Sequence, residues 1–201
     1  TEDKLWPKLK ELHYKEYMFL QELYALSDQY HDQLVKLKII GYDYRKESYD
    51  LSGGLSAKYP KLLSLNLYID CKNCFDTEVE RRLFEDFSKL SANCPQLRQL
   101  SIGLYFEGRR MSNYLSLFSS FTSITSLDLT LYGVNGWFEN SFQALSRLSR
   151  LKRLSINVSK MYDFELEGIS VYLPQLESLK LDVIKSLTDN SLPEFYSLKQ
   201  L

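Results

Sequence analysis

A short leucine motif recurs along the whole chain, and this repetition limits the possible folds more than any other feature. The first, fourth and sixth positions of each complete copy are aliphatic, except for Tyr14 at the sixth position of the first copy. The starts lie 22 to 35 residues apart, with a mean of 27. A period of about 20 to 50 residues indicates a stack of similar units. Seven complete copies and one shortened copy begin at Leu9, Leu34, Leu62, Leu97, Ile124, Leu151, Leu176 and Leu198.

Each copy is predicted to supply one strand followed by a helical stretch. From the fourth position on, apolar and polar residues alternate, as in residues 154–158, which is typical of a strand with one buried face. Thr77 and Glu80 have the spacing of a capping box, which indicates the start of a helix. Apolar residues at helical spacing predict three stripes: Val79, Leu83, Phe87, Leu90 and Cys94; Phe138, Phe142, Leu145 and Leu148; and Leu166, Ile169 and Leu173.

The residues just before each copy are predicted to end the helix. Proline lacks the N–H that would prolong a helix, and it disfavours helical backbone at the preceding residue. Four of the five prolines, Pro7, Pro60, Pro95 and Pro174, stand two residues before a first leucine. The position one residue further upstream holds a bulky or apolar side chain in every copy except the second. This side chain is expected to fill the space between helix and sheet, and we call its position the plug position. The residues there are Trp6, His31, Tyr59, Cys94, Phe121, Leu148, Leu173 and Phe195.

These units predict an α/β fold. One unit buries too few apolar side chains to offset the conformational entropy that it loses, so neighbouring units must stack. We therefore predict that residues 1–201 form a single leucine-rich-repeat domain of about eight repeats, a solenoid shaped as a horseshoe or arc. Its parallel sheet is expected on the concave face and its helices on the convex face. Neither end has a polar capping unit, so the array is expected to be truncated at both ends.

Composition excludes several classes of partner and compartment. The 25 Lys and Arg residues nearly balance the 26 Asp and Glu residues, so the net charge of −1 does not favour nucleic acid as a partner. No apolar run approaches the roughly 20 residues that span a membrane, and the first residues lack a secretion signal. Three cysteines are too few for a disulfide framework in a chain of this length. A cytoplasmic or nuclear protein without membrane contact is expected.

The sequence offers no catalytic, cofactor-binding or metal-binding set, so we expect a protein that is not an enzyme. Cys71 and Cys74 have the spacing of a zinc or redox pair, but the two histidines, His13 and His31, lie far upstream. The two thiols are therefore interpreted as loop residues. Cys94 is interpreted as a small buried hydrophobic residue.

Glycines and paired arginines also receive structural interpretations. Gly53, Gly54 and Gly103 match no phosphate-binding pattern and are interpreted as turn residues. The pairs at residues 81–82 and 109–110 are isolated, and solvated helix or loop positions are expected for them rather than a nucleic-acid patch.

The outward strand positions are the candidate binding residues. Tyr68, Tyr105 and Tyr132 are predicted to form a row along the concave edge in three successive repeats, either as a binding stripe or packed under neighbouring loops. The other outward positions mix both charges with small polar groups, which favours a folded protein or a peptide as partner. The predicted partner-binding set comprises Lys38, Asn66, Tyr68, Ser101, Tyr105, Asp128, Thr130, Tyr132, Arg153, Ser155, Asn157, Lys180 and Asp182.

One stretch resembles a known family. The sequence LSANCPQLRQLSI, from Leu90 to Ile102, resembles the cysteine-containing, ribonuclease-inhibitor-like repeats of F-box leucine-rich proteins. The same spacing of proline and leucines occurs in KYPKLLSLNL and in YLPQLESLKL. The sequence LTDNSL, from Leu187 to Leu192, resembles the motif that begins a helix in that family. The asparagine that other leucine-rich repeats carry at their ninth position is absent here.

The resemblance implies a substrate receptor of an SCF-type, cullin-based ubiquitin ligase. An F-box upstream of this chain would bind the Skp adaptor and through it the cullin, and the repeats would present a protein substrate for ubiquitination. No chemistry would occur on the repeats themselves. The alternative is a stand-alone leucine-rich-repeat scaffold or inhibitor that has no connection with ubiquitin.

Overall fold

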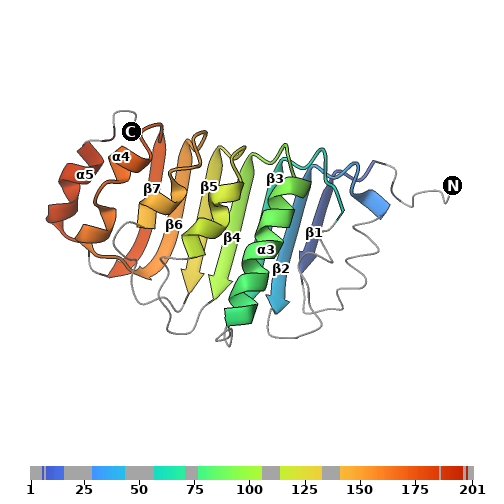
Figure 1. The fold of residues 1–201 in the computed structure, drawn as a ribbon, viewed down its shortest axis with the longest axis horizontal. Helices are drawn as coiled ribbons and strands as arrows, with labels where there is room; N and C mark the ends of the chain where they lie inside the picture. The colour runs from blue at the N-terminus through green and yellow to red at the C-terminus, as the bar shows by residue number, and fades with distance from the viewer. Residues whose placement is uncertain are drawn as a thin grey trace.

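A computed structural model of the chain contains one seven-stranded sheet (Figure 1). The structure describes residues 6, 8–15, 29–43, 57–70, 77–105, 114–132, 141–185, 187–196 and 198. Every strand pairs in parallel with the next strand along the chain, so the order in the sheet is the order in the sequence. The strands are β1 Glu11–Lys15, β2 Lys36–Asp43, β3 Ser64–Asp70, β4 Gln99–Tyr105, β5 Ser126–Tyr132, β6 Arg153–Lys160 and β7 Ser178–Lys185.

The register of the sheet follows the leucine repeats unit by unit. Leu100 on β4 pairs with Leu65 on β3 and with Leu127 on β5, and all three occupy the fourth position of their repeats. A second feature recurs with the same period: one backbone carbonyl before each of β1 to β6 accepts two N–H groups from the next unit, at 2.7–3.1 Å. The accepting residues, each at the second position of its repeat, are Lys10, Val35, Leu63, Arg98, Thr125 and Lys152. The predicted parallel strands of the seven complete copies are thus confirmed.

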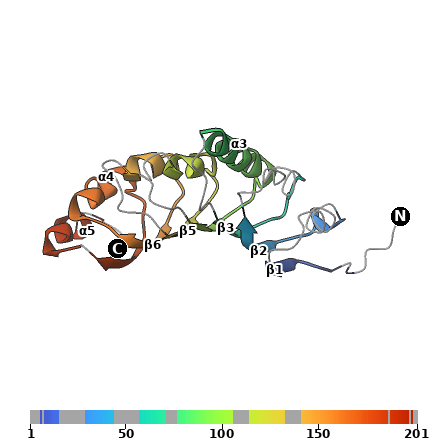
Figure 2. The ribbon, with the colours of Figure 1, turned by 90° about the horizontal axis from the view of Figure 1, so that it is seen from below.

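The helical segments lie on one face of the sheet in the part of the chain that the structure describes (Figures 1 and 2). The one long helix, α3, spans Thr77–Asn93 in the 35-residue repeat between β3 and β4. The others are short: η1 Tyr114–Ser120, η2 Ser141–Leu145, η3 Asp163–Leu166, α4 Ile169–Tyr172, η4 Asp189–Ser191 and α5 Leu192–Tyr196.

The prediction of a helix in every repeat therefore needs a correction. Repeats of 22 to 27 residues leave little chain between strands, and four of these segments are 3₁₀ turns, which rise about 2.0 Å per residue against 1.5 Å in an α-helix. A 3₁₀ segment thus covers the same length with fewer residues. The predicted α/β class is confirmed by the sheet and α3.

The core lies between the sheet and the helical layer. The described inward positions of β2 to β6 are buried, and those of the outermost strands β1 and β7 are partly buried. The described members of the predicted stripes are buried: Leu83, Phe87, Leu90, Cys94, Phe142, Leu145, Leu148, Leu166, Ile169 and Leu173. Phe138 and the side chains of Thr77, Val79 and Glu80 lie outside the described residues. Between α3 and the next repeat, the Phe87 ring meets the rings of Phe118 and Phe121 edge to face, with centroids 5.8 and 6.2 Å apart.

The plug position is confirmed in most repeats, and the same turn recurs there. Tyr59 and Cys94 are buried, and their carbonyls accept the N–H of the first leucine three residues later, at 3.3 and 3.1 Å. Phe121, Leu148 and Leu173 do the same, while Phe195 is only partly buried. The helices α3 and α4 end two residues before Pro95 and Pro174, as predicted, and Pro7 lies outside the described residues.

Two plug residues were predicted wrongly. Trp6 is 54% exposed, because its repeat contributes the first strand of the sheet and has a described neighbour on one side only. In the second repeat the buried side chain is that of Tyr30 rather than His31. The N–H of Leu34 bonds to the Tyr30 carbonyl at 3.1 Å, so this turn is one residue longer than the others.

Candidate functional site

The face of the sheet opposite the helical layer is the open face, and no described helix or strand covers it (Figure 2). Parallel sheets are usually covered on both faces, so an uncovered one is available to another molecule. The alternation of buried and accessible residues along each strand directs the predicted partner-binding side chains to this face, where each is partly or fully exposed. These residues are Lys38, Asn66, Tyr68, Ser101, Tyr105, Asp128, Thr130, Tyr132, Arg153, Ser155, Asn157, Lys180 and Asp182.

Strand pairing arranges the open face in rows that cross the strands. Neighbours within a row are about 4.8 Å apart, and successive rows are about 6.6 Å apart along a strand. The first row includes Lys36, Ser64, Gln99, Ser126 and Arg153; the second includes Lys38, Asn66, Ser101, Asp128, Ser155 and Lys180; the third includes Tyr68, Gly103, Thr130, Asn157 and Asp182; the fourth includes Tyr105 and Tyr132.

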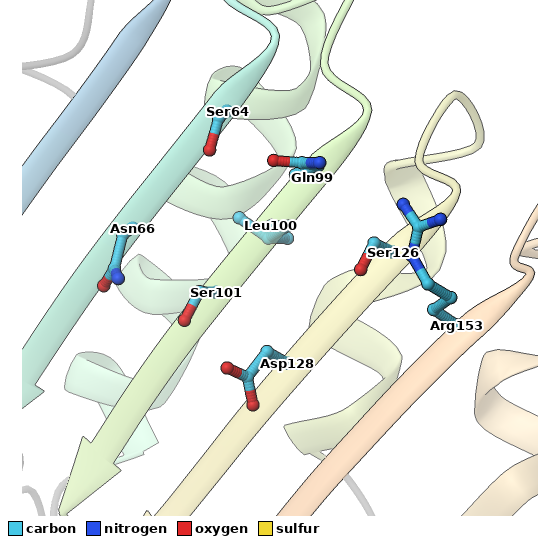
Figure 3. A pocket seen from close by; sticks show the side chains of 8 residues that line it. All are labelled: Ser64, Asn66, Gln99, Leu100, Ser101, Ser126, Asp128 and Arg153. Atoms are coloured by element: carbon cyan, nitrogen blue, oxygen red, sulfur yellow. The ribbon is translucent and has the colours of Figure 1, made fainter. Parts of the chain in front are cut away.

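The first two rows enclose a shallow hollow of about 400 Å³ over β3 to β6 (Figure 3). Its lining offers hydroxyl and amide groups, one carboxylate and one guanidinium. The sequence prediction included Arg153 but missed Ser64, Gln99 and Ser126 of the first row, although their side chains point outward like those of the second row. The lining residues are Ser64, Asn66, Gln99, Leu100, Ser101, Ser126, Asp128 and Arg153.

Two charged side chains of the hollow are available to a ligand. The Arg153 guanidinium extends over β5 toward Ser126, whereas the Asp128 carboxylate points toward β4 (Figure 3). Both side chains are exposed, and neither forms an ion pair or side-chain hydrogen bond with any residue in the described part of the chain. Elsewhere on the open face, Lys36 pairs with Glu11 at 2.8 Å and lowers the pKa of that carboxyl. Arg153 and Asp128 are therefore charges on a fixed sheet that no described residue neutralises.

The three tyrosines form a cluster at the carboxyl ends of β3 to β5. The ring centroid of Tyr132 lies 6.3 Å from that of Tyr105, with the rings nearly parallel, and 6.1 Å from that of Tyr68. Tyr132 is 42% exposed, and the other two rings are partly buried. The prediction that all three rings face outward is confirmed. Residues 106–113 and 133–140, which follow β4 and β5, lie outside the described residues, so the alternative of packing under loops is not tested.

The tyrosines do not form the straight row that was predicted. Tyr105 pairs with Tyr132, but Tyr68 pairs with Gly103 one row earlier. The Tyr68 ring reaches Tyr132 by lying over Gly103, where a Cβ atom would be only 2.5 Å from Cδ2 of Tyr68. Interpreting Gly103 as a turn residue was therefore wrong: it lies in the middle of β4 and makes room for an aromatic ring. The signal in the sequence was a glycine within a strand pattern, which often marks a close approach.

Other candidate groups do not belong to the open face. Burial of Cys94 raises the pKa of its thiol to about 12, which agrees with its interpretation as a hydrophobic residue. Arg81 and Arg82 are exposed on α3, and Arg81 pairs with Glu85, as expected of solvated helix positions. Residues 53–54, 71–76 and 109–110, which include the paired cysteines, lie outside the described residues.

One buried acid was not anticipated from the sequence. Glu165 in η3 is 1% exposed, and burial raises the pKa of its carboxyl to about 7 although the Tyr162 N–H, 2.5 Å from Oε2, opposes this shift. Oε1 is buried without a hydrogen-bond partner among the described residues. The carboxyl bonds to the backbone of its own turn, in the helical segment η3. This arrangement indicates a structural role in the turn.

The described residues contain no group of three or more metal-binding side chains close enough to hold an ion. None of the described helices is long and apolar enough to cross a membrane. A scan against models of known protein families and a search of curated proteins each find no significant match to this chain.

Proposed function

We propose that the chain is a leucine-rich-repeat solenoid that binds a protein partner on its open face. The repeat period, the strand order and the leucine register support this architecture. In Figure 2 the row of strands arches, with the helical segments on the outer side, which agrees with a sheet on the concave face.

The observation that carries the binding proposal is the juxtaposition of two charges and a tyrosine cluster on one face of the sheet. Among the described residues, these charges have no ion-pair partner and no helix or strand covers this face. Tyrosine and arginine contribute most of the binding energy at many protein interfaces. Arg153 and Tyr132 provide both side-chain types on β6 and β5, two adjacent strands that hold them at fixed spacing. Asp128 and Asp182 interrupt the basic residues of the face, which disfavours a polyanion such as nucleic acid.

A set of matched substitutions tests the binding proposal. Arg153→Ala and Tyr132→Ala on the open face are compared with Arg147→Ala and Tyr196→Ala, which remove exposed side chains of the same types from the helical layer. The full-length protein and each variant are used for affinity capture from cells, with quantitative mass spectrometry. Partners that are lost with both open-face variants and retained with both controls support the assignment. Equal retention by all four variants refutes it.

The finer part of this proposal is that the partner is a substrate of an SCF-type ubiquitin ligase. Its support is the cysteine-containing frame from Leu90 to Ile102, in which Cys94 is buried directly after α3. Capture of the Skp adaptor and a cullin by the full-length protein would support a ligase. Capture of neither would leave the alternative of a stand-alone scaffold or inhibitor.

A further inference from the structure

We propose that the open face binds an extended peptide segment of its partner, with an acidic and a large apolar side chain six residues apart. The acidic side chain pairs with Arg153, and the apolar side chain packs on the tyrosine cluster of Tyr68, Tyr105 and Tyr132. This inference rests on the proposed binding function and specifies the chemistry of the ligand.

The spacing follows from the strand register. Arg153 lies level with Ser126 on the neighbouring strand, and its guanidinium extends toward that residue (Figure 3). Tyr132 is six residues further along the same strand as Ser126. A strand rises about 3.3 Å per residue, so the two binding points are about 20 Å apart. An extended ligand has nearly the same rise, and its two anchoring side chains must therefore also be six residues apart.

The shape of the surface favours an extended segment over a rounded one. The hollow is centred on β4 and β5, and the tyrosine cluster continues along the same strands. Together they form a stripe that covers about 20 Å along the strands and about 14 Å across β3 to β6, so its longer dimension follows the strand direction. The Glu11–Lys36 pair lies beyond one side of this stripe, so that part of the face is already neutralised.

Arg153 determines the acidic end of the ligand. Its guanidinium is exposed and has no acidic partner among the described residues. A carboxylate can accept two parallel hydrogen bonds from a guanidinium, and no other side chain matches this geometry as well. The hydroxyl of Ser126 and the amide of Gln99 line the same hollow and can donate further hydrogen bonds to the ligand.

Asp128 restricts which side chain the ligand can place next to its acidic residue. A ligand with several consecutive acidic residues would not satisfy this requirement. Asp128 lies one row closer to the tyrosines than Arg153, and its carboxylate is exposed and unpaired in the described part of the chain. A second acid at the matching position of the ligand would be repelled. The position two residues from the acidic anchor, toward the apolar end, must therefore carry a hydrogen-bond donor or a neutral side chain.

The apolar end of the ligand packs on rings that already contact one another. Gly103 lets the Tyr68 ring lie across β4, and the ring of Tyr132 contacts both other tyrosines. Because the cluster forms without the ligand, little ordering is needed on binding. Such a surface suits a leucine, proline or aromatic side chain.

Peptide selection tests the inference without knowledge of the natural partner. The full chain is used to select phage that display random peptides of about 12 residues, which span about 40 Å when extended. Enriched peptides are expected to share an acid and a large apolar residue six positions apart, in either chain direction, with no acid at the position facing Asp128. Absence of enrichment, or enrichment of other patterns, overturns the inference.

Affinity measurements on one enriched peptide test the assigned contacts. By fluorescence anisotropy, Arg153→Ala is expected to weaken binding about tenfold or more, and Tyr132→Ala about fivefold or more. Arg147→Ala and Tyr196→Ala should leave the affinity unchanged within about twofold. Circular dichroism checks that every variant is folded at the assay temperature. Tyr132→Ala is expected to lower the thermal midpoint by a few degrees because it removes two ring contacts. Loss of affinity in the control variants, or none in the open-face variants, contradicts the assignment.

A charge exchange separates this inference from the proposed function. Arg153→Glu should abolish binding of the selected peptide, and replacement of the peptide's acid by lysine should restore it. Failure of this exchange overturns the peptide model. If captured cellular partners still depend on Arg153 and Tyr132, the binding function stands and only the extended-peptide model fails.

Discussion

Substitution of Gly103 by alanine tests whether the tyrosine cluster depends on a missing side chain. The new Cβ would lie 2.5, 3.1 and 3.4 Å from three ring atoms of Tyr68, whereas carbon atoms in contact are separated by about 3.5–4.0 Å. β4 is paired on both sides, so its backbone is fixed and the ring must move instead. Tyr68 would then lose its contact with Tyr132.

The expected magnitude follows from three contributions. Loss of the ring contact costs about 0.5–1.5 kcal/mol, and an unfavourable rotamer of Tyr68 costs about 0.5–1.5 kcal/mol. The reduced freedom of the unfolded chain stabilises the alanine variant by about 0.4–1 kcal/mol. We therefore expect Gly103→Ala to lower the free energy of unfolding by about 1 kcal/mol.

A double-mutant cycle isolates the contribution of the ring. In a Tyr68→Ala background no ring lies over β4, so Gly103→Ala should be neutral or stabilising by about 0.4–1 kcal/mol. The coupling energy from urea denaturation of the four proteins should therefore be about 1–2 kcal/mol. Additive effects, with coupling below about 0.3 kcal/mol, would refute the view that Gly103 exists to accommodate Tyr68.

Three further predictions concern the core and the helical layer. Leu129 on β5 is fully buried, so Leu129→Ala should lower the free energy of unfolding by about 2–5 kcal/mol in urea denaturation; a loss below about 1 kcal/mol would contradict the packing. The Glu165 pKa of about 7 lies above the unfolded value of 4.5, so the folded state holds the proton more tightly. The contribution of Glu165 to stability should be fully present below about pH 4.5 and be lost, by about 3 kcal/mol, as the pH rises through 7. The wild type should therefore lose about 3 kcal/mol more than Glu165→Gln over this range, and an equal change in the two proteins would disprove this. In a variant with serine at positions 71 and 74, a thiol reagent should modify Cys94 only as fast as the protein unfolds, and rapid labelling of the native protein would show that the thiol is accessible.

The strands could be predicted from the sequence because the same pattern of apolar residues alternating with polar residues recurs from repeat to repeat. Leu100, Leu127 and Leu154 occupy equivalent positions, and their alternation with polar residues determines both the buried face and the register. The outward positions of the candidate site followed from the same alternation. Asp128 and Arg153 could therefore be assigned to the open face without coordinates.

The connecting segments were harder to predict because apolar spacing does not distinguish a helix from a 3₁₀ turn of similar length. Phe142 and Leu145 fit a helical stripe, yet they lie in a five-residue 3₁₀ segment. Tyr30 replaced His31 as the plug because one turn has an extra residue, which a fixed offset from Leu34 cannot reveal.

The tyrosine cluster shows why parts of the site needed three-dimensional information. The sequence places the three rings on one face, with Tyr68 at the seventh position of its repeat and Tyr105 and Tyr132 at the ninth, so Tyr68 lies one row earlier in the sheet. Only the coordinates show that its ring nevertheless reaches Tyr132. Contact between Tyr68 and Tyr132 depends on the glycine between them in space, which is distant from Tyr68 in the chain. The buried carboxyl of Glu165 likewise has no signature in the residues around it.

Site-specific photo-crosslinking in cells tests most directly whether the open face binds a partner. A benzoylphenylalanine residue replaces Thr130, next to the tyrosine cluster, or Gln143, which is exposed in η2 on the helical side. The full-length protein is irradiated, and covalent adducts are identified by mass spectrometry. We expect a partner adduct from position 130 and none from position 143. Adducts from position 143 alone would contradict the assignment of the binding surface.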